Sequence, residues 1–324
     1  MNRALHFYKQ NGLNKTILNI GLRLSWGYLK YLVSRNINSI TSFEPYIVKD
    51  ILGSKMYLRK STFGLSFELI VDGIRENYIT ESWQKEINSG DIIVDIGANI
   101  GYYALLEAKL TGEKGKVYAI EPIPDNITLL KKSIDINNYK NIDIYQLAIG
   151  NSNGNAPIYV GKARNLSSMR MVDSYAEQGG YIDKIDVKLI TLDEFLKDKP
   201  SPNVVRMDTE GYEYEIIRGM SQTLAKRLPM KMFIEFHFDI IGKEKSLELL
   251  TILQTNGFEI SDATIEEWIV GSHQHKFIAH IVSYLAKKSG APPYGHKSLT
   301  ISDIISNDMI LEGKWGKLEI CFKR

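Results

Sequence analysis

Cysteine is almost absent from this chain of 324 residues, which contains a single one, Cys321. A lone thiol cannot form an internal disulfide and has no second cysteine with which to complete a metal site. The composition therefore excludes a disulfide framework and favours a cytoplasmic protein. Cys321 lies within the apolar alternation of residues 318–322, where we expect a half-buried strand residue.

A surplus of either charge is also absent, because 40 basic residues are balanced by 38 acidic ones to give a formal net charge of +2. No large basic surface is expected, so nucleic acid is not a predicted partner. The N-terminus has no short apolar core followed by a small-residue cleavage site, so no secretory signal is predicted.

Long uninterrupted apolar runs are missing as well. Residues 16–37 are apolar, but Arg23, Lys30 and Arg35 interrupt them, which argues against a membrane-spanning helix. Apolar side chains recur at helical spacing from Leu18 to Val33, so we predict an N-terminal helical extension over residues 1–45. This helix is expected to dock on the rest of the protein, with peripheral membrane contact as the alternative. The oligomeric state is not indicated.

From residue 46 onward the pattern changes to short strands and helices. A hairpin is predicted around Gly53, followed by a largely helical segment over residues 67–89. Apolar strand-like runs then alternate with amphipathic helical runs, which indicates parallel strands buried on both faces in a doubly wound α/β sheet. The predicted strands are residues 91–96, 116–121, 142–148, 204–208 and 230–236. The helices between and after them are expected to begin near Tyr102, Asp125, Tyr212 and Lys243.

Two stretches of the predicted domain, residues 46–324, are less regular. Residues 150–172 fit either a strand pair or a loop over the site. Two further strands are expected at residues 258–260 and 318–322, and the connection between them is far longer than a normal hairpin loop. We therefore predict that residues 263–315 are an insertion that caps the substrate.

A glycine-containing turn follows the first predicted strand of the sheet. Gly97 and Gly101 bracket this turn, and Glu121 ends the second strand. In a doubly wound sheet, ligands bind beyond the carboxyl ends of the strands, where a glycine turn lets the backbone approach closely. The dinucleotide fingerprint would require glycines at positions 97, 99 and 102, but this chain has Asn99 and Tyr102. The spacing therefore favours a nucleoside without a diphosphate, with Glu121 binding its ribose.

Five motifs then carry a family resemblance, and they occur in this order: VDIGANIGYY (94–103), AIEPIPDN (119–126), LAIGNSNG (147–154), VRMDTEGYEYEIIRG (205–219) and FIEFH (233–237). The sequence resembles S-adenosylmethionine-dependent methyltransferases, and more narrowly the FkbM family, over about residues 50–262, with residues 318–323 matching the final strand. The resemblance implies a class I, Rossmann-like fold with a seven-stranded, mostly parallel sheet. It also implies S-adenosyl-L-methionine as the cofactor.

The resemblance further assigns residues to parts of the cofactor. The methionine part would contact Asp95, Gly97, Asn99 and Gly101, the ribose would contact Glu121, and the adenine would lie near Ile123, Gln146 and Ala148. Arg206 stands where the family usually has lysine, and Thr209 where it often has valine.

Four residues are candidates for catalysis, namely Asp208, Glu210, Glu235 and His237. The first two follow the fourth predicted strand, and the other two are two positions apart on the fifth, so their side chains share a face. Methyl transfer depends on alignment, but a base would help a weakly nucleophilic hydroxyl, and His237 is the expected base from its usual pKa. The structural alternatives are helix capping by Asp208, a helix-dipole role for Glu210, and a hydrogen-bonded polar pair of Glu235 with His237.

No metal site is predicted. His273, His275, His280 and His296 fall in the expected insertion, but no acidic or cysteine ligand is spaced to complete a site with them.

These patterns together predict an O-methyltransferase of the FkbM type, whose acceptor is a hydroxyl of a sugar or glycoconjugate. Three alternatives remain: a methyltransferase acting on another small molecule, a nicotinamide-dependent oxidoreductase, and a catalytically inactive binding module. The glycine spacing opposes the oxidoreductase. The presence of Asp95, Glu121 and Asp208 opposes the inactive module.

Overall fold

The computed structural model describes residues 45–60, 64–162, 167–172, 180–265, 299–314 and 317–324. The predicted N-terminal helix therefore lies outside the described residues, as do His273, His275, His280 and His296. No helix in the described part of the chain is long and apolar enough to cross a membrane.

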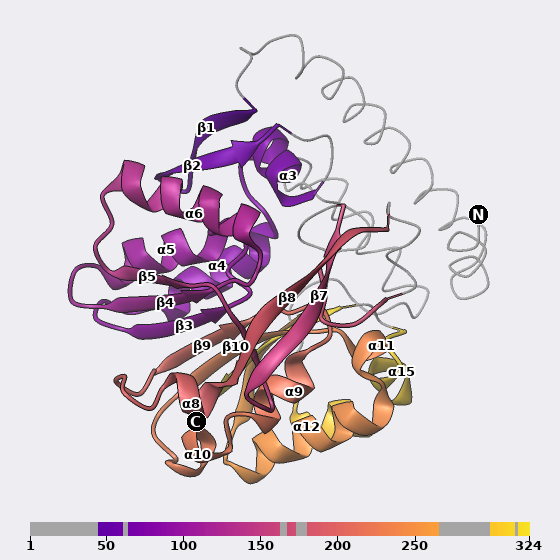
Figure 1. Ribbon diagram of the computed structural model, residues 1–324. Helices are drawn as coiled ribbons and strands as arrows, with labels where there is room; N and C mark the ends of the chain where they lie inside the picture. Colours follow the sequence, from indigo (N-terminus) through magenta and orange to yellow (C-terminus); the bar gives the residue numbers. More distant parts are fainter. Residues whose placement is uncertain (1–44, 61–63, 163–166, 173–179, 266–298, 315–316) are drawn as a thin grey trace, which may run out of the picture.

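A seven-stranded sheet forms the centre of the molecule (Figure 1). Its strand order is β11-β12-β10-β9-β3-β4-β5, and only β12 runs antiparallel to its neighbours. The chain order reverses between β3 and β9, so the carboxyl ends of these two strands form the switch point of the sheet. The predicted mostly parallel, doubly wound sheet is confirmed. The strands are β3 (Ile92–Ile96), β4 (Lys116–Ile120), β5 (Ile142–Tyr145), β9 (Val204–Met207), β10 (Lys231–Phe236), β11 (Glu259–Ile265) and β12 (Leu318–Lys323).

Helices cover both faces of this sheet (Figure 1). One face packs against α3 (Gly64–Asp72), α4 (Asn77–Glu86), α5 (Tyr102–Thr111) and α6 (Pro124–Asn137). The other packs against α8 (Leu192–Phe195), α9 (Glu213–Arg218), α10 (Ser221–Ala225), α11 (Phe238–Ile241), α12 (Lys243–Thr255), α14 (Ile301–Ile305) and α15 (Asp308–Leu311).

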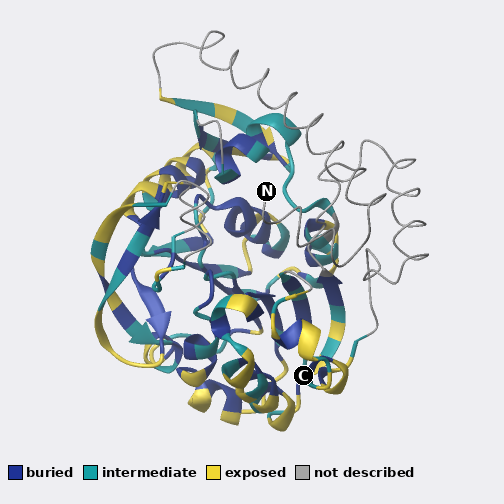
Figure 2. Ribbon diagram, turned by 90° about the vertical axis from the view of Figure 1, so that its right-hand side faces the viewer, coloured by how far each residue is buried: buried dark blue, intermediate teal, exposed yellow. Residues whose placement is uncertain are grey.

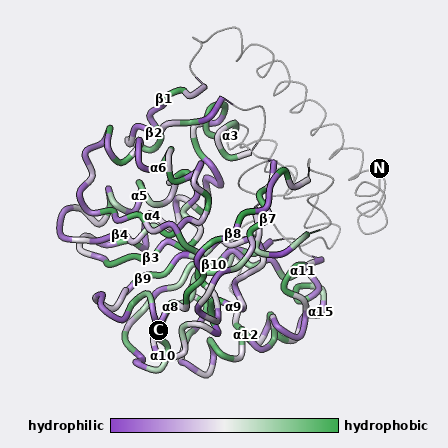
Figure 3. The backbone as a smooth tube through the Cα atoms, in the orientation of Figure 1, coloured by the Kyte–Doolittle hydropathy of each residue, from purple (hydrophilic) through white to green (hydrophobic). Residues whose placement is uncertain are grey.

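The alternation of side chains along each strand explains why both faces are apolar. On β3, Ile93 joins the core under α5, whereas Val94 and Ile96 join the core under α9 and α12. Figure 2 shows the central strands buried between the layers, and Figure 3 shows that these strands carry hydrophobic residues. The continuous apolar runs in the sequence thus result from burial on two sides.

A second, three-stranded sheet has the order β6-β8-β7 and consists of β6 (Ala148–Gly150), β7 (Gly154–Gly161) and β8 (Tyr181–Thr191). The predicted third strand, residues 142–148, is therefore wrong at its end, because β5 stops at Tyr145 and Ala148 pairs in this other sheet. Of the two alternatives for residues 150–172, a strand is correct for β7. Its antiparallel partner is β8, which the sequence pattern did not reveal.

Two regions beside the central sheet differ from expectation in detail. The predicted hairpin is confirmed as β1 (Tyr46–Ile51) with β2 (Ser54–Arg59). The helical segment expected over residues 67–89 is instead divided into α3 and α4. Glu76, immediately before α4, has a left-handed backbone with φ 44°, which interrupts the helical path.

The boundaries of the expected insertion also need correction. β11 continues to Ile265, so residues 263–265 belong to the central sheet. At the other end, α14 and α15 place Ile301, Ile304, Ile310 and Leu311 in the hydrophobic core. Apolar side chains that complete the core cannot form a separate cap. The prediction of a cap over the remaining residues, 266–298, concerns a stretch outside the described residues.

Candidate functional site

A pocket of about 680 Å³, including its open mouth, lies at the carboxyl ends of β3, β4 and β9, with β6 and β7 contributing a second wall. This is the switch point where a doubly wound sheet binds its ligand. The lining includes seven of the predicted site residues: Gly97, Asn99, Glu121, Ile123, Ala148, Asp208 and Glu210.

The turn after β3 lies close to the end of β9. Gly97 has φ +85°, and a Cβ atom there would lie 2.1 Å from the backbone oxygen of Asp208. Only glycine tolerates both this conformation and this approach. Asn99 is also left-handed, with φ 53°, and its N–H donates to Glu121 Oε2 at 2.9 Å. The turn therefore joins the ends of three strands around the pocket.

Gly101 lies outside the pocket lining, and its packing explains the need for glycine there. It is buried, and it is not among the pocket-lining residues. Its φ is +93°, and a Cβ atom would lie 2.3 Å from Leu130 Cδ1 on α6. The glycine thus allows α5 to begin close against α6.

Glu121 provides a fixed carboxyl group in the pocket wall, where the residue is 4% exposed. Its Oε1 accepts hydrogen bonds from Ile123 N–H at 2.9 Å and Asn126 Nδ2 at 3.2 Å, and its Oε2 accepts from Asn99 N–H. Burial raises the pKa of Glu121 to about 7, although these hydrogen bonds oppose the shift. Of its two oxygens, Oε2 has the greater remaining capacity to accept a bond from a ligand.

The side of the pocket beyond Glu121 is apolar. Ile123 and Ala148 lie there as predicted, together with Leu147, Ile149, Ile158 and Met169. Such a lining suits a flat aromatic ring. Gln146, which was expected nearby, is exposed and is not among the residues that line the pocket.

Asp95 lies one layer behind the pocket and is fully buried. Its Oδ1 accepts a hydrogen bond from Arg206 Nη1 at 3.1 Å, while Arg206 Nη2 lies 3.4 Å from Asp208 Oδ2. The guanidinium also packs 3.9 Å from the centroid of the Tyr103 ring. Asp95 is not among the pocket-lining residues, so its position supports Arg206, which in turn holds Asp208.

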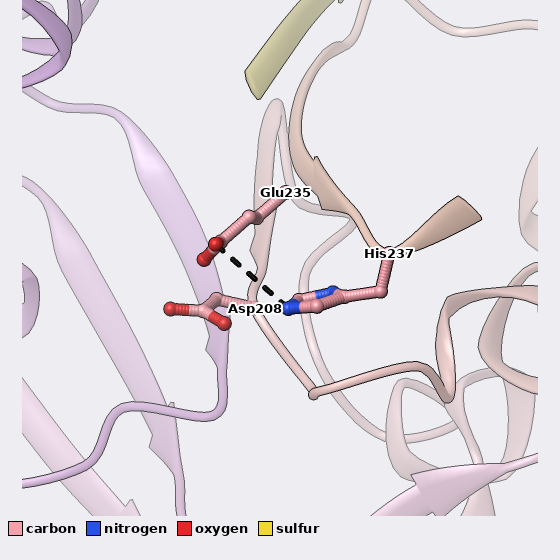
Figure 4. A group of neighbouring side chains, drawn as sticks. All are labelled: Asp208, Glu235 and His237. Carbon is pink, nitrogen blue, oxygen red and sulfur yellow. Dashed lines mark ion pairs between the residues drawn. The ribbon is translucent and has the colours of Figure 1, made fainter. Parts of the chain in front are cut away.

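The four predicted catalytic residues come together at the ends of β9 and β10. His237 Nε2 lies 3.2 Å from Glu210 Oε2 and 3.8 Å from Glu235 Oε1. Figure 4 shows Glu235 and His237 directed toward each other beside Asp208. Asp208 and Glu210 line the pocket, whereas Glu235 and His237 are buried behind them.

Glu213 completes this group, and sequence reasoning missed it. Its Oε1 accepts hydrogen bonds from Thr209 Oγ1 at 3.1 Å and Gly211 N–H at 3.1 Å, and it lies 3.0 Å from His237 Nδ1. Because this oxygen acts as an acceptor, Nδ1 of His237 carries a proton and donates. The signal was present in the motif MDTEGYE, where Glu213 is the second glutamate.

Lys317, just before β12, was also missed, and its Nζ lies 3.0 Å from Glu235 Oε1 and 3.5 Å from Glu210 Oε2. Burial opposes ionisation of both glutamates, but Lys317 and His237 outweigh it and lower the pKa of each carboxyl. The resulting group is a network of buried, paired charges.

The charges around His237 change its expected role. Burial lowers its pKa, but Glu213 and Glu210 outweigh burial and hold the pKa well above its ordinary value. An imidazolium cannot accept a proton, so His237 in this setting is a poor base. Burial instead raises the pKa of Asp208, assisted by Glu235 and opposed by Arg206. Asp208, with a side chain 16% exposed in the pocket wall, is the better-placed base.

Comparison with known proteins identifies the family to which the chain belongs. Residues 95–260 match the Methyltransferase FkbM domain. The chain belongs to the FkbM methyltransferase family. The match begins at Asp95 and includes the turn, Glu121 and the group at the ends of β9 and β10, so the family covers most of the site.

Two curated proteins are similar to this FkbM protein in sequence. It is 28% identical over 147 residues to the hexuronic acid methyltransferase AglP of Haloferax volcanii, an alignment that covers 43% of this chain and 54% of AglP. It is 24% identical over 194 residues to methyltransferase 1 of Beauveria bassiana, covering 52% of this chain and 72% of that protein. The chain thus spans about half the length of AglP.

Solved structures resemble the FkbM protein more distantly. Methyltransferase FkbM from Methylobacillus flagellatus is 19% identical with a TM-score of 0.38, over 53% of this chain and 39% of that one. TYW2 of M. jannaschii, in complex with AdoMet, is 16% identical with a TM-score of 0.37, over 88% of this chain and 89% of that one. The fold assignment accordingly rests on the strand order of the sheet itself.

The protein thus carries a domain of a family of S-adenosylmethionine-dependent methyltransferases. Family membership decides against the oxidoreductase alternative, in agreement with the glycine spacing. The pocket fits the cofactor, because it combines a fixed carboxyl group at Glu121, an apolar slot and a glycine turn where a Cβ atom could not be accommodated.

Proposed function

We propose that this FkbM family protein is an O-methyltransferase that acts on a hydroxyl group of a sugar or glycoconjugate. The observation that carries the proposal is the position of Asp208, a carboxyl group with a raised pKa in the wall of the pocket. A hydroxyl acceptor needs such a group, because it must lose its proton as it becomes methylated. The similarity to AglP, a hexuronic acid methyltransferase, supports a sugar as the acceptor.

In this proposal the cofactor occupies the pocket along its length. Glu121 Oε2 would accept a hydrogen bond from a ribose hydroxyl, and the adenine would lie against Ile123 and Ala148. The methionine part would lie at the turn of Gly97 and Asn99. When bound there, the cofactor supplies an electrophilic methyl group on a sulfonium.

The protein's own residues would then orient the acceptor and move one proton. The carboxylate of Asp208 would accept the proton that the acceptor hydroxyl loses as it is methylated. Arg206 holds Asp208 in place from one side. Glu210, also in the wall, is kept ionised by Lys317 and His237, so it can accept hydrogen bonds from neighbouring hydroxyls of a sugar.

The test uses purified full-length protein, methyl-labelled S-adenosylmethionine and a panel of glycans with and without hexuronic acid. We expect a labelled sugar that keeps its methyl group after mild alkali, as an ether does. Loss of the label in alkali would reveal a methyl ester and overturn the hydroxyl acceptor. Label on nitrogen, or only on acceptors other than sugars, would overturn the sugar proposal. Asp208→Asn should abolish labelling, whereas Glu248→Gln, on the exposed side of α12, should not.

A further inference from the structure

We propose that Asp208, Glu235 and His237 form a binding site for one divalent cation, with Mn²⁺ as the best-matched ion, beside the cofactor pocket. Each residue offers one ligand atom, and these three atoms all lie within 4.8 Å of one another. Figure 4 shows the three side chains as neighbours, with an ion pair between Glu235 and His237. The sequence predicted no metal site, because no acidic or cysteine ligand is spaced to complete one with His273, His275, His280 and His296.

The orientation of His237 is the first supporting observation. Its Nδ1 donates to Glu213 Oε1 at 3.0 Å, so Nε2 is the nitrogen that faces the carboxylates, at 3.2 Å from Glu210 Oε2 and 3.8 Å from Glu235 Oε1. A histidine that binds a metal commonly donates its other ring N–H to a carboxylate in this way. Binding of the ion at Nε2 would displace the proton that this nitrogen otherwise carries.

Unsatisfied carboxylate oxygens are the second observation. Asp208 Oδ1 and Glu235 Oε2 are buried and have no hydrogen-bond partner among the described residues. A buried oxygen without a donor or cation is costly. Glu235 lies directly opposite Glu319 of β12, and burial together with Glu235 raises the pKa of Glu319 well above its ordinary value. A divalent cation between the two carboxylates would supply positive charge to both side chains.

Lys317 occupies one edge of this group and would compete with the ion. Its ammonium lies 3.0 Å from Glu235 Oε1, the oxygen that is already paired. Its side chain is 25% exposed, so it can withdraw into solvent when an ion binds. This competition makes the proposal testable in two directions, since removal of a ligand should weaken binding and removal of Lys317 should strengthen it.

The ligand set indicates the kind of ion. Two carboxylates suit Mg²⁺ or Mn²⁺, and an imidazole ligand favours Mn²⁺ over Mg²⁺. Three protein ligands leave coordination positions open, and Asp208 faces the pocket. An acceptor hydroxyl could bind there and lose its proton more easily. This last role rests on the proposed function, whereas the binding of the ion does not.

The experiment is a titration of the full-length protein with Mn²⁺, followed by the loss of its free-ion electron paramagnetic resonance signal. We expect one bound ion in the wild type, at least tenfold weaker binding in Glu235→Gln, at least threefold tighter binding in Lys317→Met, and wild-type binding in Glu248→Gln. Circular dichroism checks that each variant is folded, and Asp208→Asn replaces Glu235→Gln if that variant is not.

Absence of bound Mn²⁺ in the wild type would overturn the proposal for the native protein, even if Lys317→Met binds it. Wild-type affinity in the ligand variant would also overturn it, because the ion would then lie elsewhere. If Mn²⁺ binds as expected but the methylated product is not a sugar ether, the metal site stands and the proposed function fails.

Discussion

We predict that Glu121 makes ligand binding sensitive to pH in a range where few side chains titrate. Burial raises its pKa to about 7, and in the proposed function a ribose hydroxyl would donate to the ionised form. Protonation of Glu121 must therefore compete with binding, so affinity should fall as the pH drops below its pKa and level off above it.

The magnitude follows from the pKa. For a group with a pKa of about 7, the ionised fraction is about one eleventh at pH 6 and about ten elevenths at pH 8. If only the ionised form binds, the dissociation constant rises about tenfold from pH 8 to pH 6, which corresponds to about 1.4 kcal/mol. Calorimetry should also detect proton release on binding at pH 6, as a binding enthalpy that varies with the buffer.

The ligand for this assay is 5′-methylthioadenosine, because it keeps the ribose but lacks the titratable amino-acid part of the cofactor. Glu121→Gln provides the control, since its binding should be weaker and nearly independent of pH. Equal affinity of the wild type at pH 6 and pH 8 would refute the reasoning, and would place the ribose away from Glu121. A pH dependence that persists in the glutamine variant would assign the titration to another group.

Three further changes test the site by different routes. Asp208→Asn should lower kcat by about 10²- to 10⁴-fold, which is the usual contribution of a general base to the rate. The affinity for S-adenosylhomocysteine should change by no more than about twofold. A normal kcat in this variant would exclude Asp208 as the base. Gly97→Ala should lower the free energy of unfolding in urea by more than about 3 kcal/mol, because the new Cβ atom would lie 2.1 Å from a backbone oxygen. Gly90→Ala is the control: Gly90 has a similar φ of +89° but nothing within 4 Å of the added Cβ atom, so the loss should be only about 1 kcal/mol. Similar losses in the two variants would mean that the contact with β9 is unimportant. Arg206→Met should lower the free energy of unfolding by about 3 to 5 kcal/mol, because it leaves a buried carboxylate unpaired. Arg218→Met, which removes an exposed ion pair, should lower it by less than about 1 kcal/mol. Comparable losses in the two variants would contradict the structural role of Arg206.

Family-level features of the site were visible in the sequence because they depend on short stretches of chain. The turn at Gly97 and the acid at the end of β4 follow from local spacing, and both line the pocket. Periodicity similarly predicted most strands and the starts of α5, α6 and α12. It failed at β6, because an apolar strand looks the same in either sheet, and the choice between them depends on pairing with β8.

The sequence by itself determined the doubly wound sheet and placed Glu121, Asp208, Glu210 and Glu235 at its carboxyl edge, since these depend on local pattern, and the family resemblance implied the cofactor. Only the tertiary structure decided which charges are paired. Arg206 reaches Asp95 across 111 residues, Glu213 fixes His237, and Lys317 comes from the chain just before the last strand. The protonation of a buried group depends on such neighbours, and this is why we propose Asp208 rather than His237 as the base.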